Sequence, residues 1–401
     1  RVGFMLSKKV LELSKQHSVI RDIFEFGMER AKEVGAENVF DFSIGNPSVP
    51  APKEVDETAM KYIENGDPVA VHGYTSNAGI FEVRDAVAKS LNKRFDTAYS
   101  ADNIFMTIGA AAAVGICFKS LVDGPEDEII TFAPYFPEYQ VYAEGAGCKL
   151  TVIPAETETF QIDFERLKSA INVHTKAVLI NSPNNPSGAV YSRETIQRLA
   201  ELLTEKQKET GHSIYIISDE PYREIVYDGI ELPHVPKYYD NTLVCYSFSK
   251  SLSIPGERIG YIIAPCKAED YADLLPVFIA SGRLLSYVSV PALYQKVVGD
   301  CADLTADLSV YQANKDLFYN ALTDMGYECV EPGGAFYLFP KALEPDANAF
   351  CERAKKYDLL MVPGDSFGCP GYVRISYCVP TERIEKALPL FQKLIDEYKE
   401  N

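Results

Sequence analysis

Tryptophan is absent from this chain, histidine is scarce at five residues, and no hydrophobic run is long. The longest apolar runs, such as Ala177–Ile180 and Ile214–Ile217, have the length of a strand. A membrane span needs about 20 apolar residues, so we predict no membrane partner. No two histidines have the spacing of metal ligands, and we therefore predict no metal site.

Basic clusters are missing as well. The formal net charge is -18, from 39 basic and 57 acidic residues, and the densest basic groups are pairs such as Lys8-Lys9 and Lys355-Lys356. Such a field repels nucleic acid, so we predict no nucleic-acid partner. The nine cysteines are odd in number and contain no CxxC pair, which indicates reduced thiols and a cytoplasmic protein.

The middle of the chain alternates short apolar runs with amphipathic stretches, a pattern that favours a largely parallel sheet covered by helices. The last third is a helix-rich mixture over Leu293–Met325, followed by two short strand candidates and a final amphipathic helix. We predict an α/β fold with an arm and part of a small domain at 1–47, a large domain at 48–286 and a small α+β domain at 287–401. The strand candidates are Glu128–Phe132, Lys176–Ile180, Ser213–Ile217, Thr242–Tyr246, Ala335–Phe339 and Tyr372–Tyr377, and the helix candidates are Arg193–Lys208, with Ser192 as N-cap, and Arg383–Tyr398.

Polar side chains follow three of the central strands at the points where those strands end. Ligands of open α/β sheets bind beyond the carboxyl ends of the strands, because loops from several strands converge there. We therefore expect these polar groups to meet at one edge of one sheet. In chain order they are Asn185, Asp219, Tyr222, Ser247, Ser249 and Lys250.

This set of groups matches the needs of pyridoxal phosphate (PLP). The cofactor requires an amine for its aldehyde, an acid beside its ring nitrogen, and donors for its phenolic oxygen and its phosphate. Lys250 can supply the amine and Asp219 the acid, while Asn185 and Tyr222 can donate to the phenolic oxygen. The phosphate donors would be Ser247, Ser249 and Arg258.

Two further segments fit the same cofactor. Ala110 and Ala111 follow the strand candidate Ile104–Met106 and open an apolar helix, whose free amides would attract a phosphate. Phe136 follows another strand and offers an aromatic face on which the cofactor ring could stack.

The segments NSPNNPSG, SDEPY, SFSKSLSIPGERIGY and GYVRISY resemble those of the aspartate aminotransferase superfamily, the class I/II aminotransferases of PLP fold type I. The resemblance covers nearly the whole chain, in the right order. It implies a large domain with a mostly parallel seven-stranded sheet between helices, and a smaller α+β domain.

The resemblance also implies a role for each residue of the PLP site. Lys250 would be the Schiff-base lysine and proton carrier, and Asp219 the partner of the ring nitrogen. Asn185 and Tyr222 would bind the phenolic oxygen, with Tyr222 counted beside Lys250 and Asp219 as catalytic. The phosphate would be held by Ala110, Ala111, Ser247, Ser249 and Arg258.

Further roles concern the substrate and a second subunit. Arg374 would clamp the α-carboxylate of the substrate, with Asn185 and the backbone of Gly45 beside it. Tyr74 would reach the phosphate of the neighbouring subunit in a homodimer. The reaction implied is ping-pong transfer of an amino group from an L-amino acid to a 2-oxo acid.

The sequence departs from aspartate-specific members of the superfamily at three places. Phe136 stands where those members often have Trp, and Ala110-Ala111 stand where some members carry a polar or basic residue. Arg283 lies one residue out of register with the arginine that reads a distal carboxylate, so the sequence leaves the identity of the amino donor open.

Two alternatives share the PLP site. A lyase of the same fold, cleaving a carbon–sulfur bond or forming a cyclopropane, would need nearly every residue above. A PLP-sensing regulator would carry a basic DNA-binding head before the fold. Because Gly45 already falls in the substrate loop, we expect too little chain before it for such a head. We therefore expect the regulator to be the weaker of the two alternatives.

Overall fold

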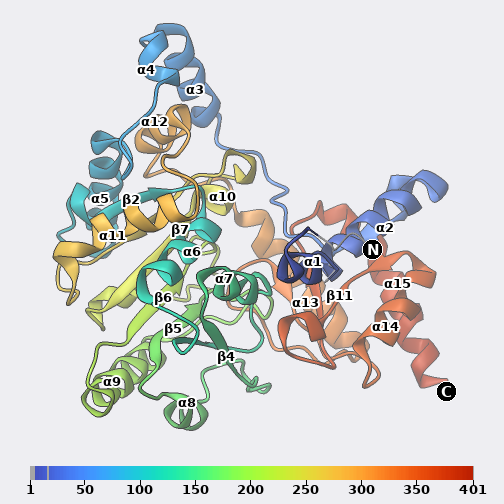
Figure 1. Ribbon diagram of the computed structural model, residues 1–401. Coiled ribbons are helices and arrows are strands. Elements are labelled where there is room, and N and C mark those ends of the chain that lie inside the picture. Colours follow the sequence, from blue (N-terminus) through green and yellow to red (C-terminus); the bar gives the residue numbers. More distant parts are fainter. Residues whose placement is uncertain (1–4, 16–17, 401) are drawn as a thin grey trace.

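A computed structural model describes residues 5–15 and 18–400 of the chain (Figure 1). Its largest element is a seven-stranded sheet in the order β2-β8-β7-β6-β5-β3-β4. Only β8 runs antiparallel to its neighbours, β2 and β7, so the predicted α/β fold with a mostly parallel seven-stranded sheet is confirmed. The strands are β2 (Ile104–Thr107), β3 (Glu128–Phe132), β4 (Lys149–Ile153), β5 (Thr175–Asn181), β6 (Tyr215–Asp219), β7 (Thr242–Ser247) and β8 (Gly260–Ile263).

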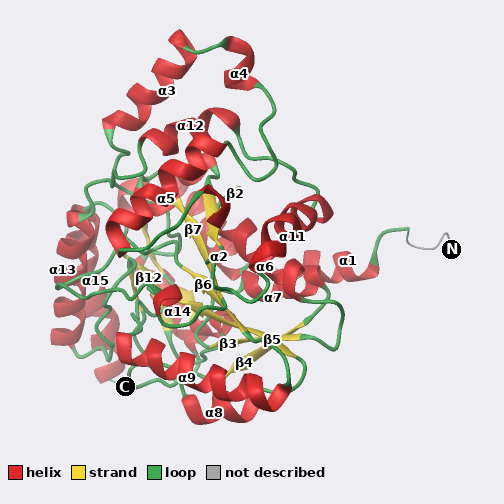
Figure 2. Ribbon diagram, turned by 90° about the vertical axis from the view of Figure 1, so that its left-hand side faces the viewer, coloured by secondary structure: helices red, strands yellow, loops and turns green. Residues whose placement is uncertain are grey.

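Helices cover both faces of this sheet (Figure 2). Neighbouring residues of one strand belong to different hydrophobic clusters, as Ile129 and Ile130 of β3 do, because side chains alternate between the faces. Most of the strands are buried on both faces, which is why they read as continuous apolar runs. The covering helices include α5 (Phe81–Phe95), α6 (Ala110–Leu121), α7 (Glu138–Ala146), α8 (Phe164–Ala170), α9 (Arg193–Thr210), α11 (Tyr271–Leu284) and α12 (Ala292–Asp300).

The C-terminal third forms a second cluster of elements, shown in orange and red in Figure 1. Its three-stranded antiparallel sheet has the order β11-β12-β9. Part of the N-terminal segment packs here too, because β1 (Phe40–Asp41) pairs with β10 (Leu359–Leu360). The remaining elements of the cluster are α2 (Val19–Val34), α13 (Ser309–Met325), β9 (Tyr337–Leu338), α14 (Ala347–Ala354), β11 (Val362–Pro363), β12 (Val373–Ser376) and α15 (Thr381–Lys399).

Most predicted elements are confirmed, with shifted bounds. The strand expected at Ser213–Ile217 is β6, which begins two residues later and includes Asp219. Ser192 caps α9 as predicted, since its hydroxyl accepts a hydrogen bond from the Thr195 amide. The mixed stretch 293–325 is two helices, α12 and α13. The domain division at residues 47 and 286 stays a prediction. Residues 1–4 and 16–17 of the predicted arm, and residue 401 of the predicted small domain, lie outside the described residues.

Two helices, α3 (Lys53–Asn65) and α4 (Pro68–His72), lie at one end of the molecule, beyond α12 and α5 (Figures 1 and 2). The short helix α1 (Lys8–Lys15) has no buried residue. Among the described residues, no helix combines the length and the apolar character that crossing a membrane requires.

Candidate active site

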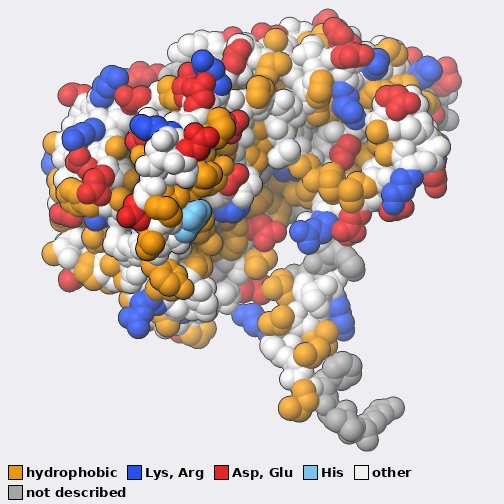
Figure 3. All heavy atoms as spheres, turned by 90° about the horizontal axis from the view of Figure 1, so that it is seen from above, with side chains coloured by type: hydrophobic (Ala, Val, Ile, Leu, Met, Phe, Trp, Pro, Cys, Tyr) orange, Lys and Arg blue, Asp and Glu red, His pale blue; other side chains and the backbone are white. Residues whose placement is uncertain are grey.

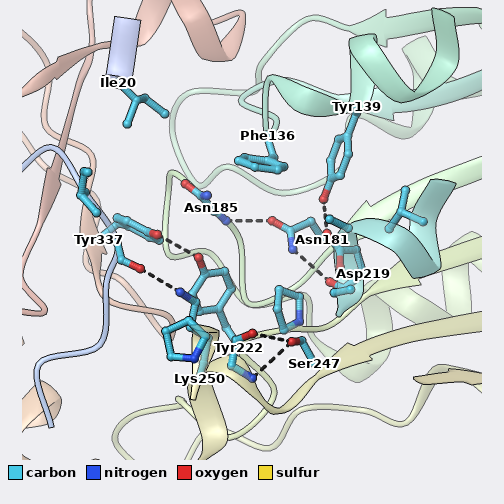
Figure 4. Close-up of a pocket in the computed structure, with 18 of the residues that line it drawn as sticks. Ile20, Phe136, Tyr139, Asn181, Asn185, Asp219, Tyr222, Ser247, Lys250 and Tyr337 are labelled. Carbon is cyan, nitrogen blue, oxygen red and sulfur yellow. Dashed lines mark hydrogen bonds between the residues drawn. The ribbon is translucent and has the colours of Figure 1, made fainter. Parts of the chain in front are cut away.

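A cavity of about 340 Å³ lies at the carboxyl ends of β5, β6 and β7. Asn181 and Asp219 are paired last residues of β5 and β6, and Ser247 ends β7, so the parallel strands deliver these side chains to one edge (Figure 4). The structure brings together every predicted site residue except Tyr74. The predicted residues that line the cavity are Gly45, Ala110, Ala111, Phe136, Asn185, Asp219, Tyr222, Ser247, Ser249, Lys250, Arg258 and Arg374.

Asp219 presents an unpartnered oxygen in this wall. The Tyr139 hydroxyl donates to its Oδ2, whereas its Oδ1 is buried without a hydrogen-bond partner among the described residues (Figure 4). Burial raises the pKa of the Asp219 carboxyl to about 7, although the hydrogen bond from Tyr139 acts in the opposite direction. A buried carboxyl oxygen without a donor is costly, so this geometry favours a ligand that brings a donor or a positive charge.

Lys250 is the one lysine among the described residues of the cavity wall. It lies in the short helix α10 (Phe248–Ser251), and its Nζ donates to the Gly45 carbonyl oxygen at 2.8 Å. Burial lowers the pKa of this amine to about 8, and the charges of Arg258 and Arg374 act in the same direction. A nucleophilic amine therefore forms more readily here than at an exposed lysine.

Arg374, on β12, is buried at the other side of the cavity. Its Nη1 donates to Asn185 Oδ1 at 3.0 Å and its Nη2 donates to the Ser43 carbonyl oxygen, while Nε has no partner among the described residues. The guanidinium lies 4.7 Å from the ring centroid of Tyr337 and 4.9 Å from that of Phe367. These contacts fix the fork and leave a donor open, an arrangement suited to a carboxylate.

Tyr222 lies near Lys250, and Tyr337 lies near Arg374. The hydroxyls of Tyr222 and Tyr337 are 2.8 Å apart (Figure 4). A side chain at Gly45 would collide with the Tyr337 hydroxyl, so only glycine lets this backbone pass so close. The Gly45 carbonyl can then accept the hydrogen bond from Lys250.

The opposite end of the cavity gathers hydroxyls, amides and one guanidinium. Ser247 Oγ and Ser249 Oγ are 2.7 Å apart, and both side chains are buried. The helix α6 begins beside them with Ala110, so its first amides have no partner within the helix. Gly109 has φ +88°, and a Cβ there would lie 3.0 Å from Arg258 Nη2. This end is built for an anion such as phosphate.

Two residues considered from the sequence lie outside the cavity. The Tyr74 side chain is fully exposed, and Arg283 is exposed near the end of α11. Neither contributes to the site of its own subunit.

The sequence predictions missed several lining residues. Tyr139 stands one helical turn after Phe136, and Tyr337 lies in a predicted strand, but nothing in their spacing shows which hydroxyl they meet. Ile20 comes from α2, more than 200 residues from Lys250 in the chain. The missed residues are Ile20, Ile44, Val114, Tyr139, Tyr142, Asn181, Pro221, Pro255 and Tyr337.

A family model, aminotransferase class I and II, matches residues 37–389. The chain belongs to the class I and II aminotransferases. An aspartate aminotransferase of Thermotoga maritima is 32% identical over 391 residues, which are 94% of this chain and 99% of the relative. The enzyme is thus an aminotransferase, and its family depends on pyridoxal 5′-phosphate. Nothing in these likenesses favours the lyase or the regulator.

Solved structures agree with this assignment. An amino transferase from Eubacterium rectale has a TM-score of 0.97 and 54% identity, with 99% of this chain and 100% of that chain covered. The aspartate aminotransferase of Thermus thermophilus, solved with maleate, has a TM-score of 0.84 and 26% identity, with 98% and 100% covered. The aminotransferase fold is therefore shared over nearly the whole chain.

Proposed function

We propose that this aminotransferase binds pyridoxal 5′-phosphate in the cavity and moves an amino group from an L-amino acid to a 2-oxo acid by a ping-pong mechanism. The observation that carries the proposal is the unpartnered Asp219 Oδ1, in the same cavity as a lysine amine whose pKa is lowered to about 8. A carboxyl oxygen without a donor and an amine without a counterion are unfavourable in a buried site. Both are suited to a ring nitrogen and an aldehyde.

The remaining residues of the cavity fit the other groups of the cofactor. Asn185 and Tyr222 would hold the phenolic oxygen, and Phe136 would stack on the ring. The anion-binding end would hold the phosphate through charge-assisted hydrogen bonds. That end consists of the Ala110 and Ala111 amides, Ser247, Ser249 and Arg258.

When bound, the cofactor supplies an aldehyde for the amino group and a protonated ring that accepts electrons from Cα. Asp219 would hold the proton on the ring nitrogen, since an ionised carboxylate favours a neighbouring cation. Lys250 Nζ would take the proton from the substrate Cα as general base and deliver it, as general acid, to the cofactor carbon that carried the aldehyde. Arg374 would hold the α-carboxylate through its fork and thereby orient the Cα–H bond.

The working unit we propose is a homodimer in which Tyr74 completes the phosphate site of its neighbour. Tyr74 is fully exposed in the single chain, and apolar side chains on and near α3 and α4 are more than half exposed. Figure 3 shows hydrophobic side chains gathered on the face that these two helices occupy. The exposed apolar residues of this region are Met60, Ile63, Val69 and Phe81. Hybrids of Lys250→Ala and Tyr74→Phe subunits should recover part of the activity, and a fully active monomer in sedimentation would contradict the dimer.

Covalent trapping tests the proposed function directly. Borohydride should fix the cofactor to one lysine, and trypsin should then release it on residues 238–258, because a modified Lys250 is no longer cleaved. In a separate sample, the unreduced cofactor-loaded protein, mixed with an amino acid alone, should release one equivalent of 2-oxo acid per site. A label on another lysine, or no oxo acid from any amino acid, would contradict the proposal.

A further inference from the structure

Only four charged side chains line the described part of the cavity: Asp219, Lys250, Arg258 and Arg374. Each of the four lies in a different part of the cavity. Arg258 lies against Gly109 at the anion end, and Asp219 is held by Tyr139 in the wall between. Apart from the reactive amine of Lys250, one cation is left for the substrate, and that cation is Arg374.

Arg374 has room for one carboxylate. Two of its nitrogens already donate to Asn185 Oδ1 and to the Ser43 carbonyl oxygen, and Nε is the buried donor without a partner. Every α-amino acid brings an α-carboxylate to such a fork. A second carboxylate on the side chain would meet no further cation among the described lining residues. Desolvation of that charge would then weaken binding.

Apart from Asn185, the lining side chains near Arg374 are apolar or aromatic. Tyr337, Ile44 and Ile20 line this part, and Figure 4 shows Ile20 on the side of Tyr337, away from Asp219 and Ser247. Such a surface gains free energy when it covers an apolar side chain.

The packing of α2 places Ile20 over the cavity. Ile23 is buried, and a Cβ at Gly27 would lie 2.8 Å from Leu360 Cδ1, so the helix is pressed against the C-terminal elements through that face. Ile20 stands three residues before Ile23 on the same helical face. It therefore carries this apolar face one turn further, into the cavity wall.

We propose that the amino donor has an uncharged, apolar side chain and that Ile20 contacts this side chain and selects for it. The inference rests on the proposed function, because it takes the cavity as the site of the donor. It predicts a preference opposite to the dicarboxylic donor named in the relatives called aspartate aminotransferase.

A second copy of the chain is another source of a cation. Arg283 is exposed on α11 and does not line the cavity of its own chain, so a neighbouring subunit would have to deliver it. If the neighbouring subunit placed Arg283 in the cavity, acidic donors would be favoured over apolar ones. Substitution of Arg283 tests for this contribution.

Equilibrium binding to the cofactor-loaded protein separates the two outcomes without turnover. Calorimetry would compare 4-methylpentanoate, an apolar monocarboxylate, with maleate, a dicarboxylate. We expect the monocarboxylate to have at least a tenfold lower Kd, about 1.4 kcal/mol. Ile20→Ala should weaken the monocarboxylate about tenfold with little effect on maleate, and Ile20→Lys should reverse the preference.

Two further variants serve as controls. Met28→Ala removes an exposed apolar side chain from the same helix, outside the cavity, and should change neither Kd. Arg374→Lys loses the planar fork and should weaken both ligands alike by at least about tenfold.

Tighter binding of maleate by the wild type would overturn the proposal. If Arg283→Ala then abolished that binding, the neighbouring subunit would be the reader of the second carboxylate. An unchanged preference in Ile20→Lys would overturn the role of Ile20. Failure of the proposed function is a separate result, because it would appear as no label on Lys250 and no oxo acid from any amino acid.

Discussion

Lys250, which is partly buried, and Lys315, which is buried, have opposite surroundings. Lys250 lines the cavity and donates to one backbone carbonyl, and burial lowers its pKa to about 8. Lys315, on α13, is 1% exposed, but its Nζ lies within 2.9 Å of Asp228, Asp316 and Glu331. Burial alone would lower the pKa of Lys315, yet hydrogen bonds to these three carboxylates raise it above its ordinary value. Burial does not decide what a lysine does; its counterions do.

The same contrast separates the cavity from the rest of the protein. In the cavity, Asp219 Oδ1 and Arg374 Nε are buried without partners among the described residues, and Lys250 has no carboxylate beside it. Around Lys315 the buried ammonium is compensated by three carboxylates. Charges left uncompensated cost stability, and such clusters are a feature of sites that bind ligands of matching charge. The comparison therefore predicts that the cavity residues affect activity and that Lys315 affects stability.

Removal of Lys250 should have the largest effect. Lys250→Ala deletes the amine that we assign to both cofactor attachment and proton transfer, so kcat should fall at least about 10³-fold. The melting temperature should stay the same or rise, because an uncompensated buried amine is removed. Steady-state kinetics and calorimetric melting are the measurements, with the exposed Lys267→Ala as control. Retention of more than a tenth of the rate would remove Lys250 from the mechanism.

Asp219→Asn is expected to come next. An amide keeps the shape of the side chain but cannot hold a proton on the ring nitrogen by charge, so kcat should fall at least about 10²-fold while the cofactor still binds. Kinetics and equilibrium cofactor binding would show this split. The exposed Asp240→Asn should behave like the wild type. A near-normal kcat in Asp219→Asn would mean that this carboxylate has no catalytic role.

Lys315→Met should lower stability and leave kcat nearly unchanged, the reverse of what we expect for Lys250→Ala. It leaves Asp228, Asp316 and Glu331 facing one another, although these side chains are about half exposed and solvent screens their repulsion. The free energy of unfolding should fall by about 1–3 kcal/mol, with kcat within about twofold of the wild type. Denaturant titration and kinetics would measure both.

The control for Lys315 is an exposed ion pair. Lys341 lies 3.4 Å from Glu328 with 55% of its side chain exposed, so Lys341→Met should change stability by less than about 1 kcal/mol. Equal losses in the two variants would show that burial adds nothing to the Lys315 cluster, and the comparison would fail.

The sequence predicts the residues that surround Lys250 better than those that surround Lys315. Residues such as Asn185, Asp219 and Lys250 follow apolar strands, and the geometry of a parallel sheet alone brings strand ends together. No such rule joins Lys315 to Asp228 and Glu331, because those contacts depend on how a loop folds over α13. The pairing of Tyr139 with Asp219 was missed for the same reason.

Some elements also escaped the sequence patterns. The strand β8 has only four residues, and β4 is partly exposed, so neither was predicted as a strand. The break between α12 and α13 falls in a stretch without a strong helix breaker. Ile20 could not be foreseen as a lining residue, since its place depends on the packing of α2 against Leu360.

The smallest predicted effect is the pH dependence of stability, and in it the two lysines should differ. In the cofactor-free protein the pKa of Lys250 is lowered to about 8 from an ordinary value of 10.5. Between these values the unfolded chain binds more protons than the folded one, so stability rises with pH across this window. Lys250→Ala should lose this rise, which is at most about 1.4 kcal/mol per pH unit.

Lys315 should behave in the opposite way, because its pKa is raised. Its contribution to stability is fully present below the unfolded pKa of about 10.5 and is lost only as the pH rises toward the higher folded value. From pH 8 to 10.5 the stability difference between wild type and Lys315→Met should therefore stay constant, while that between wild type and Lys250→Ala changes. Denaturant titrations of the three proteins at several pH values measure both differences. Parallel pH profiles for all three would show that folding does not shift the pKa values of Lys250 and Lys315 in opposite directions.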